Sequence, residues 1–208
     1  MKNVYWTLWL VVGMPLAVMA ADDPKPEDMA PQDLLKTRLS QVLSILQQKD
    51  LDTDQKSQKV EKIVNPMFDF QMMAKLTLGK THWTGMTPEQ RQRFTDLFVK
   101  RLKDFYRDKL MSYSNEEVVY KAPISTAKTA QVPTEILSKD SKIAIVYKFG
   151  KIGEQWKIYD VEIQGVSLVT SYRAQFDEFI QKQGIEALLK ELEKDLPAPP
   201  AQGDAAQN

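Results

Sequence analysis

The chain contains no cysteine and a single histidine, His82, among its 208 residues. Without cysteine it can form no disulfide bond, no thiolate metal site and no lipid anchor on an N-terminal cysteine. His82 stands in no H-x-x-x-H or His-carboxylate pattern, and no G-x-G-x-x-G or phosphate loop is present. The sequence therefore predicts neither a resident metal ion nor a cofactor.

An excess of either charge is also missing, because 28 Lys and Arg residues balance 28 Asp and Glu residues. A nucleic-acid-binding domain normally carries a clear positive excess on one face. We therefore expect no nucleic-acid partner.

Long apolar runs are confined to the N-terminus, where residues 1–20 read MKNVYWTLWLVVGMPLAVMA. Lys2 precedes an uncharged stretch that is broken by Gly13 and Pro15 and ends in small residues, which is typical of a cleavable signal peptide. A retained membrane anchor is the alternative, but a run of roughly 18 residues is at the short limit for a span. Export without cysteine favours the periplasm of a Gram-negative bacterium.

The remaining chain is long enough for one hydrophobic core. Residues 21–31 and 197–208 are rich in proline or lack apolar periodicity, so we expect a disordered linker and a disordered tail around a single domain at 32–196.

Residues 165–170, GVSLVT, raise the question of a nucleophilic serine between a strand and a helix. A nucleophile elbow reads G-x-S-x-G, but here Val169 holds the last position, and His82 is the only histidine that could serve as base. We favour a helix start, with Ser167 or Thr170 as N-cap and Gly165 in the turn.

Two carboxylates lie in apolar surroundings, Asp69 between two phenylalanines and Asp160 in the strand-like WKIYDVEI. Either could be an acid of raised pKa. The favoured interpretation is structural: Asp69 as a helix N-cap, and Asp160 as a hydrogen-bonding residue near a strand end.

Hydrophobic periodicity predicts helices first, then strands, then helices again. The expected helices are 32–48, 53–64, 65–83 with Gly79 as C-cap, 87–111 opened by the capping box Thr87-Pro88-Glu89-Gln90, 168–182 and 185–195. The expected strands are 117–122, 128–138, 141–149 and 154–164. Segregated helices and strands predict an α+β fold, with helices packed on a curled antiparallel sheet of about four strands.

Large adaptable side chains are abundant between residues 65 and 111, including Met67, Met72 and Met73. They are compatible with an ordinary core and equally with a cavity for an apolar ligand.

Two segments, 65–94 and 156–193, resemble the periplasmic toluene-tolerance, or Mla C, family. They carry F-D-F-x-x-M-A-x-L-x-L-G, T-P-E-Q-R and Y-D-V-x-I-x-G-V-S-L-V-x-x-Y-R-x-Q-F in order, and the resemblance spans about residues 34–195. It implies an NTF2-like sheet, a hydrophobic pocket and a bound phospholipid as cargo. It also implies two partners, an MCE-type component of an inner-membrane ABC transporter and an outer-membrane lipoprotein complex, and it implies no catalysis.

Within this resemblance we assign the acyl tails to an apolar set on helices, strands and the 165–168 turn. The set comprises Met72, Met73, Leu76, Phe98, Leu102, Phe105, Ile143, Ile145, Tyr147, Phe149, Ile158, Val161, Val166 and Leu168. We also expect a monomer, with Arg91, Lys100 and Lys103 as docking candidates. An ordinary solvated helix face is the alternative for those three cations.

Three functions remain open from the sequence. The favoured one is a carrier that shuttles phospholipid between membrane complexes and maintains lipid asymmetry. The alternatives are a periplasmic hydrolase that uses Ser167 or Asp69, and a chaperone or tethering module without a ligand.

Overall fold

The computed structural model describes residues 29–111, 116–138 and 141–194. The expected signal peptide and C-terminal tail lie outside these ranges and stay predictions. The first helix begins at Pro31, the last residue of the segment for which we expected disorder. Within the described ranges, no helix is both long and apolar enough to cross a bilayer.

The described helices agree closely with those that periodicity predicts. They are α1 (Pro31–Leu46), α2 (Thr53–Val64), the 3-10 turn η1 (Asn65–Met67), α3 (Phe70–Gly85), α4 (Pro88–Met111), α5 (Leu168–Gln183) and α6 (Ile185–Leu192). The predicted capping box opens α4, because the Thr87 hydroxyl accepts from the Gln90 amide at 3.2 Å and the Gln90 side chain accepts from the Thr87 amide at 2.9 Å.

A turn inside α3 divides it in two. Gly79 has φ 68° and ψ 171°, so the first part ends there, as the predicted C-cap requires, and a second short stretch continues to Gly85. Arg173 of α5 donates to the Leu76 carbonyl at 2.7 Å and satisfies an acceptor that the break leaves without its helical partner. The break in α3 is thereby joined to α5.

The strands form one antiparallel sheet, and the predicted α+β class is confirmed. Its members are β1 (Glu117–Tyr120), β2 (Ile124–Ser125), β3 (Thr129–Leu137), β4 (Lys142–Ile152), β5 (Gln155–Ile163) and β6 (Val166–Ser167). The order is β1-β3-β4-β5-β6, with β2 also paired to β3. The four longer strands are those expected from the sequence, and the two-residue strands β2 and β6 are additions.

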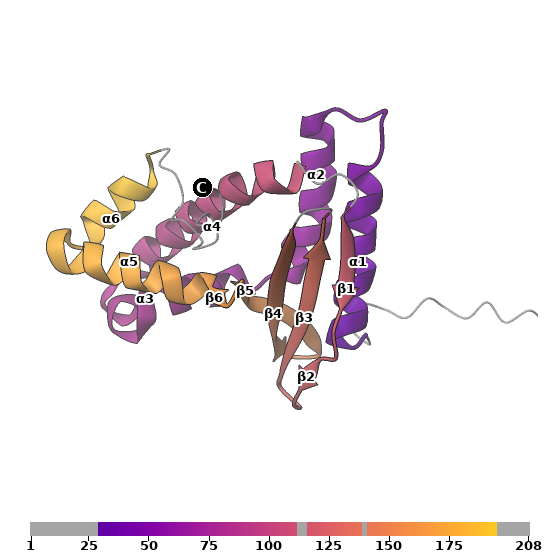
Figure 1. Cartoon of the computed structure of the whole chain (residues 1–208). Helices are drawn as coiled ribbons and strands as arrows, with labels where there is room; N and C mark the ends of the chain where they lie inside the picture. Colours follow the sequence, from indigo (N-terminus) through magenta and orange to yellow (C-terminus); the bar gives the residue numbers. More distant parts are fainter. Residues whose placement is uncertain (1–28, 112–115, 139–140, 195–208) are drawn as a thin grey trace, which may run out of the picture.

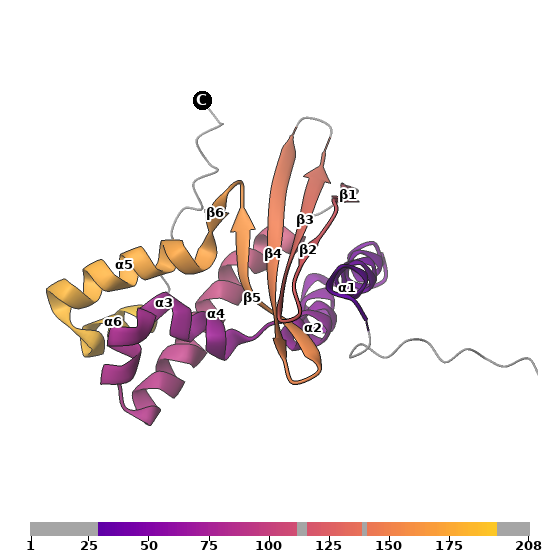
Figure 2. The same cartoon turned by 90° about the horizontal axis from the view of Figure 1, so that it is seen from below.

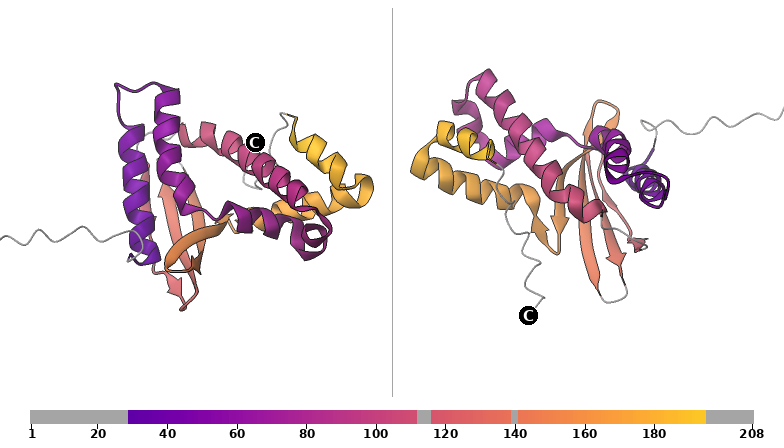
Figure 3. Two further views of the ribbon diagram at one scale, coloured as in Figure 1. Left: turned by 180° about the vertical axis from the view of Figure 1, so that it is seen from behind. Right: turned by 90° about the horizontal axis from the view of Figure 1, so that it is seen from above.

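The helices form two groups around the sheet (Figure 1). The pair α1 and α2 covers one face, which the view from behind shows most clearly (Figure 3). The group α3, α5 and α6 extends sideways beyond β5 and β6, and α4 runs from this group towards α2 (Figure 2). The face of the sheet opposite α1 and α2 is left uncovered by helices in Figure 1.

Cross-strand register defines the two faces. Ala130, Val132 and Thr134 pair with Phe149, Tyr147 and Ile145, and this set forms the inner face towards α1 and α2. The outer face carries the ion pairs Lys121–Glu135–Lys142 and Asp160–Lys148–Glu162 next to a few apolar residues such as Val146. Half of the sheet surface is therefore apolar and enclosed, as expected for an antiparallel sheet with one covered face.

A β-bulge in β5 decides which of its residues are enclosed. Phe149 pairs with Ile158, whereas the preceding Lys148 pairs with Asp160, so Tyr159 is the extra residue. Ile158 and Asp160, two positions apart, consequently lie on opposite faces. The bulge places the apolar Ile158 in the core and Asp160 beside Lys148.

Candidate functional site

The junction between β5, β6 and α5 is a helix start. The Ser167 hydroxyl accepts from the Thr170 amide at 3.1 Å, as an N-cap does, and donates to Asp160 at 2.7 Å. Asp160 also accepts from the Val169 amide at 3.2 Å and from Lys148 at 3.1 Å. The carboxylate of Asp160 is buried but has donors on both oxygens, so the structural interpretation of Asp160 and Ser167 is confirmed.

Ser167 has no histidine beside it. His82 instead bonds Asp177 across α3 and α5 at 2.8 Å, and this contact joins two helices of the side group. The hairpin turn before Ser167 requires a glycine at position 165, because Gln164 and Gly165 have positive φ angles of 50° and 81°. Space is not the reason, since no atom lies within 4 Å of a Cβ built on Gly165. The arrangement provides no serine–histidine dyad.

Asp69 has the predicted N-cap role at α3. Its side chain accepts from the Met72 amide at 2.9 Å, and its own amide donates to the Ile158 carbonyl at 2.9 Å. Phe68 forms an isolated parallel bridge with Ile158. The segment before α3 is thus attached to the edge of β5.

The predicted lipid-binding residues converge on one hydrophobic core. Eight of them are buried there and come from α3, α4, β4, β5 and α5: Met73, Phe98, Leu102, Ile145, Phe149, Ile158, Val161 and Leu168. Tyr147 packs against the same core. The sequence thus selects side chains that meet in space, although their role as a lipid site stays a prediction.

The other predicted residues lie nearer the surface. Leu76, Phe105 and Val166 are half-buried. Val166 pairs with Ile163 in the two-stranded contact of β5 and β6, which puts it on the inner face with Ile145 and Tyr147. Met72 and Ile143 are 39% and 38% exposed, so both offer apolar surface at the boundary of the core.

Aromatic rings bind α4 to α5. Phe98 lies edge-on to Tyr172 with ring centroids 5.2 Å apart, and Phe94 lies edge-on to Phe176 at 5.5 Å. Burial raises the pKa of Tyr172 to about 12, and the positive charge of the Arg101 guanidinium acts in the opposite direction. Burial also raises the pKa of Tyr106 and of Tyr147 well above the usual range of a phenol. These hydroxyls are therefore neutral in the interior.

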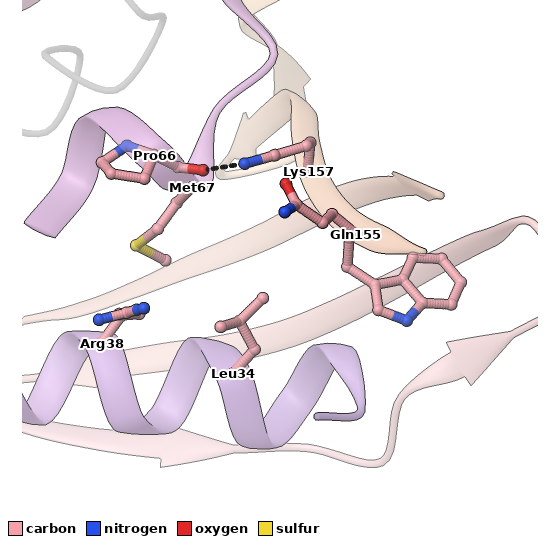
Figure 4. Close-up of a pocket in the computed structure, with 7 residues that line it drawn as sticks. Leu34, Arg38, Pro66, Met67, Gln155 and Lys157 are labelled. Carbon is pink, nitrogen blue, oxygen red and sulfur yellow. Dashed lines mark hydrogen bonds between the residues drawn. The ribbon is translucent and has the colours of Figure 1, made fainter. Parts of the chain in front are cut away.

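Among the described residues, two hollows are lined by none of the fourteen predicted lipid-binding residues. The first, of about 190 Å³, lies between α1, η1 and the hairpin of β4 and β5 (Figure 4). The second, of about 470 Å³, lies between α2, α3 and α4 and includes Glu61, Phe70, Lys100 and Lys103. Eight of those fourteen residues are instead buried in the main hydrophobic core.

The three docking candidates do not form one basic stripe. Lys100 and Lys103 share the second hollow, where Lys100 pairs with Asp104 at 2.9 Å and Lys103 pairs with Glu61 at 3.6 Å. Arg91 donates to the Trp83 carbonyl at 2.8 Å and caps the C-terminus of α3. Nine residues are two and a half helical turns, which places Arg91 opposite Lys100 on α4. Arg91 therefore has a structural role that the spacing of charges did not reveal.

Comparison with known proteins identifies the family. The family described as MlaC protein matches residues 36–194. The chain belongs to the MlaC family. A solved phospholipid-binding protein from Ralstonia solanacearum, in complex with a phospholipid, superposes with a TM-score of 0.72 at 29% identity, covering 79% of this chain and 95% of that one.

Two curated relatives agree with the MlaC assignment. The toluene tolerance protein ttg2D of Pseudomonas putida is 25% identical over 85% of this chain and 82% of its own length. The intermembrane phospholipid transport system binding protein MlaC of Haemophilus influenzae is 21% identical over 64% of this chain and 65% of its own length. The resemblance read from the sequence is confirmed.

Sequence reasoning missed several residues that hold this MlaC fold together. Asp52 and Gln55 form a capping box at α2, at 2.8 and 3.1 Å, and the D-x-x-Q spacing could have revealed it. Arg173 and the bulge at Tyr159 act across distant segments, so no local signal marks them.

Proposed function

We propose that this chain is a periplasmic carrier that encloses the acyl tails of a phospholipid and passes the lipid between complexes of the inner and outer membranes. The observation that carries the proposal is the convergence of predicted tail-binding side chains from five elements on one apolar interior. Membership of the MlaC family and the phospholipid bound by the Ralstonia solanacearum neighbour support the choice of ligand.

The size of the hydrophobic effect explains why such a protein needs to enclose both tails. Two sixteen-carbon tails contain about thirty methylenes, and exposing them to water costs on the order of 20 kcal/mol at about 0.8 kcal/mol each. Release into water is therefore extremely slow. The lipid has to move while the carrier is in contact with its acceptor.

Loading a lipid into this interior requires buried side chains to move. A side chain such as Ile145 or Phe149, buried between sheet and helices, has to move before a tail can take its place. Met73 and its neighbours on α3 suit this role, since methionine adapts to variable space. We infer that the helices and the inner face separate when lipid enters.

Phospholipid is cargo on this proposal, and no cofactor takes part. The partners we propose are an MCE-type component of an inner-membrane ABC transporter and an outer-membrane lipoprotein complex, with the carrier acting as a monomer in the periplasm. A hydrolase is disfavoured by the hydrogen bonds of Ser167 and His82, which engage separate partners.

Mass spectrometry of the intact protein, purified without detergent after expression with its N-terminal segment, tests the proposal. We expect a mass increment of one phospholipid, and extraction should return that lipid in stoichiometric amount. Protein that is free of lipid, and that takes up none from vesicles, would support the chaperone or tethering alternative instead.

A further inference from the structure

The hollow between α1 and the β4–β5 hairpin has an unusual balance of charge. Its lining consists of Leu34, Arg38, Pro66, Met67, Gln155, Trp156 and Lys157. Arg38 and Lys157 bring two positive charges, and no carboxylate is part of the lining. The second hollow differs, because Glu61, Asp96 and Asp104 accompany its two lysines.

Both cations are oriented by neutral partners. Lys157 donates to the Pro66 carbonyl at 2.6 Å, which fixes its ammonium at the rim and leaves two further N–H groups (Figure 4). Arg38 donates to the side chain of Gln41 at 3.2 Å, one turn along α1. Within the described ranges no carboxylate forms an ion pair with either residue.

Arg38 and Lys157 are half-buried and line the same hollow, so their two positive charges repel each other across it. An anion between them would offset this repulsion. A guanidinium matches the oxygens of a phosphate through paired N–H groups, and the Gln155 amide of the same lining adds a further donor. A volume of about 190 Å³ leaves room for a phosphate group together with the start of whatever group it is attached to.

The floor of the hollow is apolar. Leu34 and Met67 are each 5% exposed and belong to the main core, between α1 and the inner face of the sheet. Figure 4 shows Leu34 on α1 and Met67 below η1, both within this hollow. A ligand with a charged head at the rim could extend an apolar part past these two side chains.

From this lining we infer that Arg38, Lys157 and Gln155 form a binding site for a phosphate group. The phosphate could be that of a lipid head or a free phosphate. The lipid alternative rests on the proposed carrier function, whereas the anion site itself depends only on the lining of the hollow.

The test uses lipid-free protein and two fluorescent lipids with identical tails, phosphatidic acid and diacylglycerol. We expect wild-type protein to take up phosphatidic acid with at least about tenfold preference, the size of effect that hydrogen bonds to a charged group produce. The double variant Arg38→Gln/Lys157→Gln should lose this preference and still take up diacylglycerol. Lys36→Gln/Lys128→Gln removes two exposed lysines outside the hollow and should behave as wild type.

A second arm measures binding of inorganic phosphate to lipid-free protein by calorimetry. Saturable binding that Arg38→Gln alone abolishes would assign the site to free phosphate, and preference for phosphatidic acid without phosphate binding would assign it to a lipid head. Equal preference in wild type and double variant, without phosphate binding, would overturn the site. Failure to take up either lipid would instead contradict the carrier function. Arg38→Gln leaves the Lys157–Pro66 contact intact, so it controls for misfolding of the double variant.

Discussion

At the scale of single residues, the polar groups beside the core serve the ends of helices. Ser167, Asp69 and Arg91, each of which could be read as functional from the sequence, satisfy backbone groups at the starts of α5 and α3 and at the end of α3. Asp160 does the same for the Val169 amide while it pairs with Lys148. These four residues, whose types often occur in active sites, here stabilise helix ends around an apolar interior.

Ser167→Ala tests this structural role. The variant loses the N-cap of α5 and one donor to Asp160, so we expect a loss of about 1–2 kcal/mol in the free energy of unfolding. Lipid content should remain that of wild type. Urea denaturation and lipid extraction measure the two quantities, and Ser167→Thr, which retains a hydroxyl, serves as control. Loss of lipid at unchanged stability would contradict a purely structural Ser167.

At the scale of elements, sequence periodicity predicts the bounds of a helix and the buried face of a strand, which depend on neighbouring residues. The helix 53–64 matches α2 at both ends, and the alternation of 143–149 identifies the inner face of β4 because each strand has one covered face. The bulge at Tyr159 depends on how β5 pairs with β4, and the Arg173 contact joins residues 97 positions apart. Local patterns carry no information about such pairings, nor about which apolar side chains fill the interior and which border a cavity.

Gly79 offers a test of the break in α3. Its φ of 68° and ψ of 171° lie in a region that is essentially restricted to glycine, so Gly79→Ala should cost about 1–3 kcal/mol of stability. Gly85→Ala, in the same element, has no atom within 4 Å of the added Cβ and no positive φ, and should change stability by less than about 0.5 kcal/mol. Urea denaturation compares the two variants. Equal losses of stability in the two variants would show that alanine adopts the backbone conformation of residue 79 without strain.

The short strand β6 tests the inner face as a lipid wall. Val166 is half-buried opposite Ile163, so Val166→Glu would place a carboxylate among acyl tails, which costs several kcal/mol unless it is neutralised. We expect a folded protein that retains no lipid. The control Thr170→Glu adds the same charge at an exposed position in the first turn of α5 and should retain lipid. Normal lipid content in Val166→Glu, measured by mass spectrometry, would refute the assignment of this face.

At the scale of the whole molecule, two groups of helices share one core with the sheet. The pair α1 and α2 covers the inner face, while α3, α5 and α6 stand beside the edge formed by β5 and β6 (Figures 1 and 2). The main core nevertheless includes Leu35 of α1, Phe149 of β4 and Leu189 of α6. Because one apolar cluster connects both groups, a change in their separation would alter the space available for tails.

The mechanism of transfer follows from the energy of tail exposure. With a cost on the order of 20 kcal/mol for leaving the protein, loss of lipid to buffer should be negligible over hours. Transfer to an acceptor should need contact, so its rate should rise with acceptor concentration. Lys100→Glu/Lys103→Glu should slow this transfer and weaken its salt dependence if that hollow docks the acceptor. Arg91 is left unchanged because it caps α3.

The lipid content of the isolated Lys100→Glu/Lys103→Glu variant should equal that of wild type. A fluorescent-lipid assay with vesicle-bound acceptor at several concentrations measures these rates. A rate independent of acceptor concentration would refute transfer by contact, and an unchanged rate in the double variant would leave Lys100 and Lys103 as an ordinary solvated part of α4.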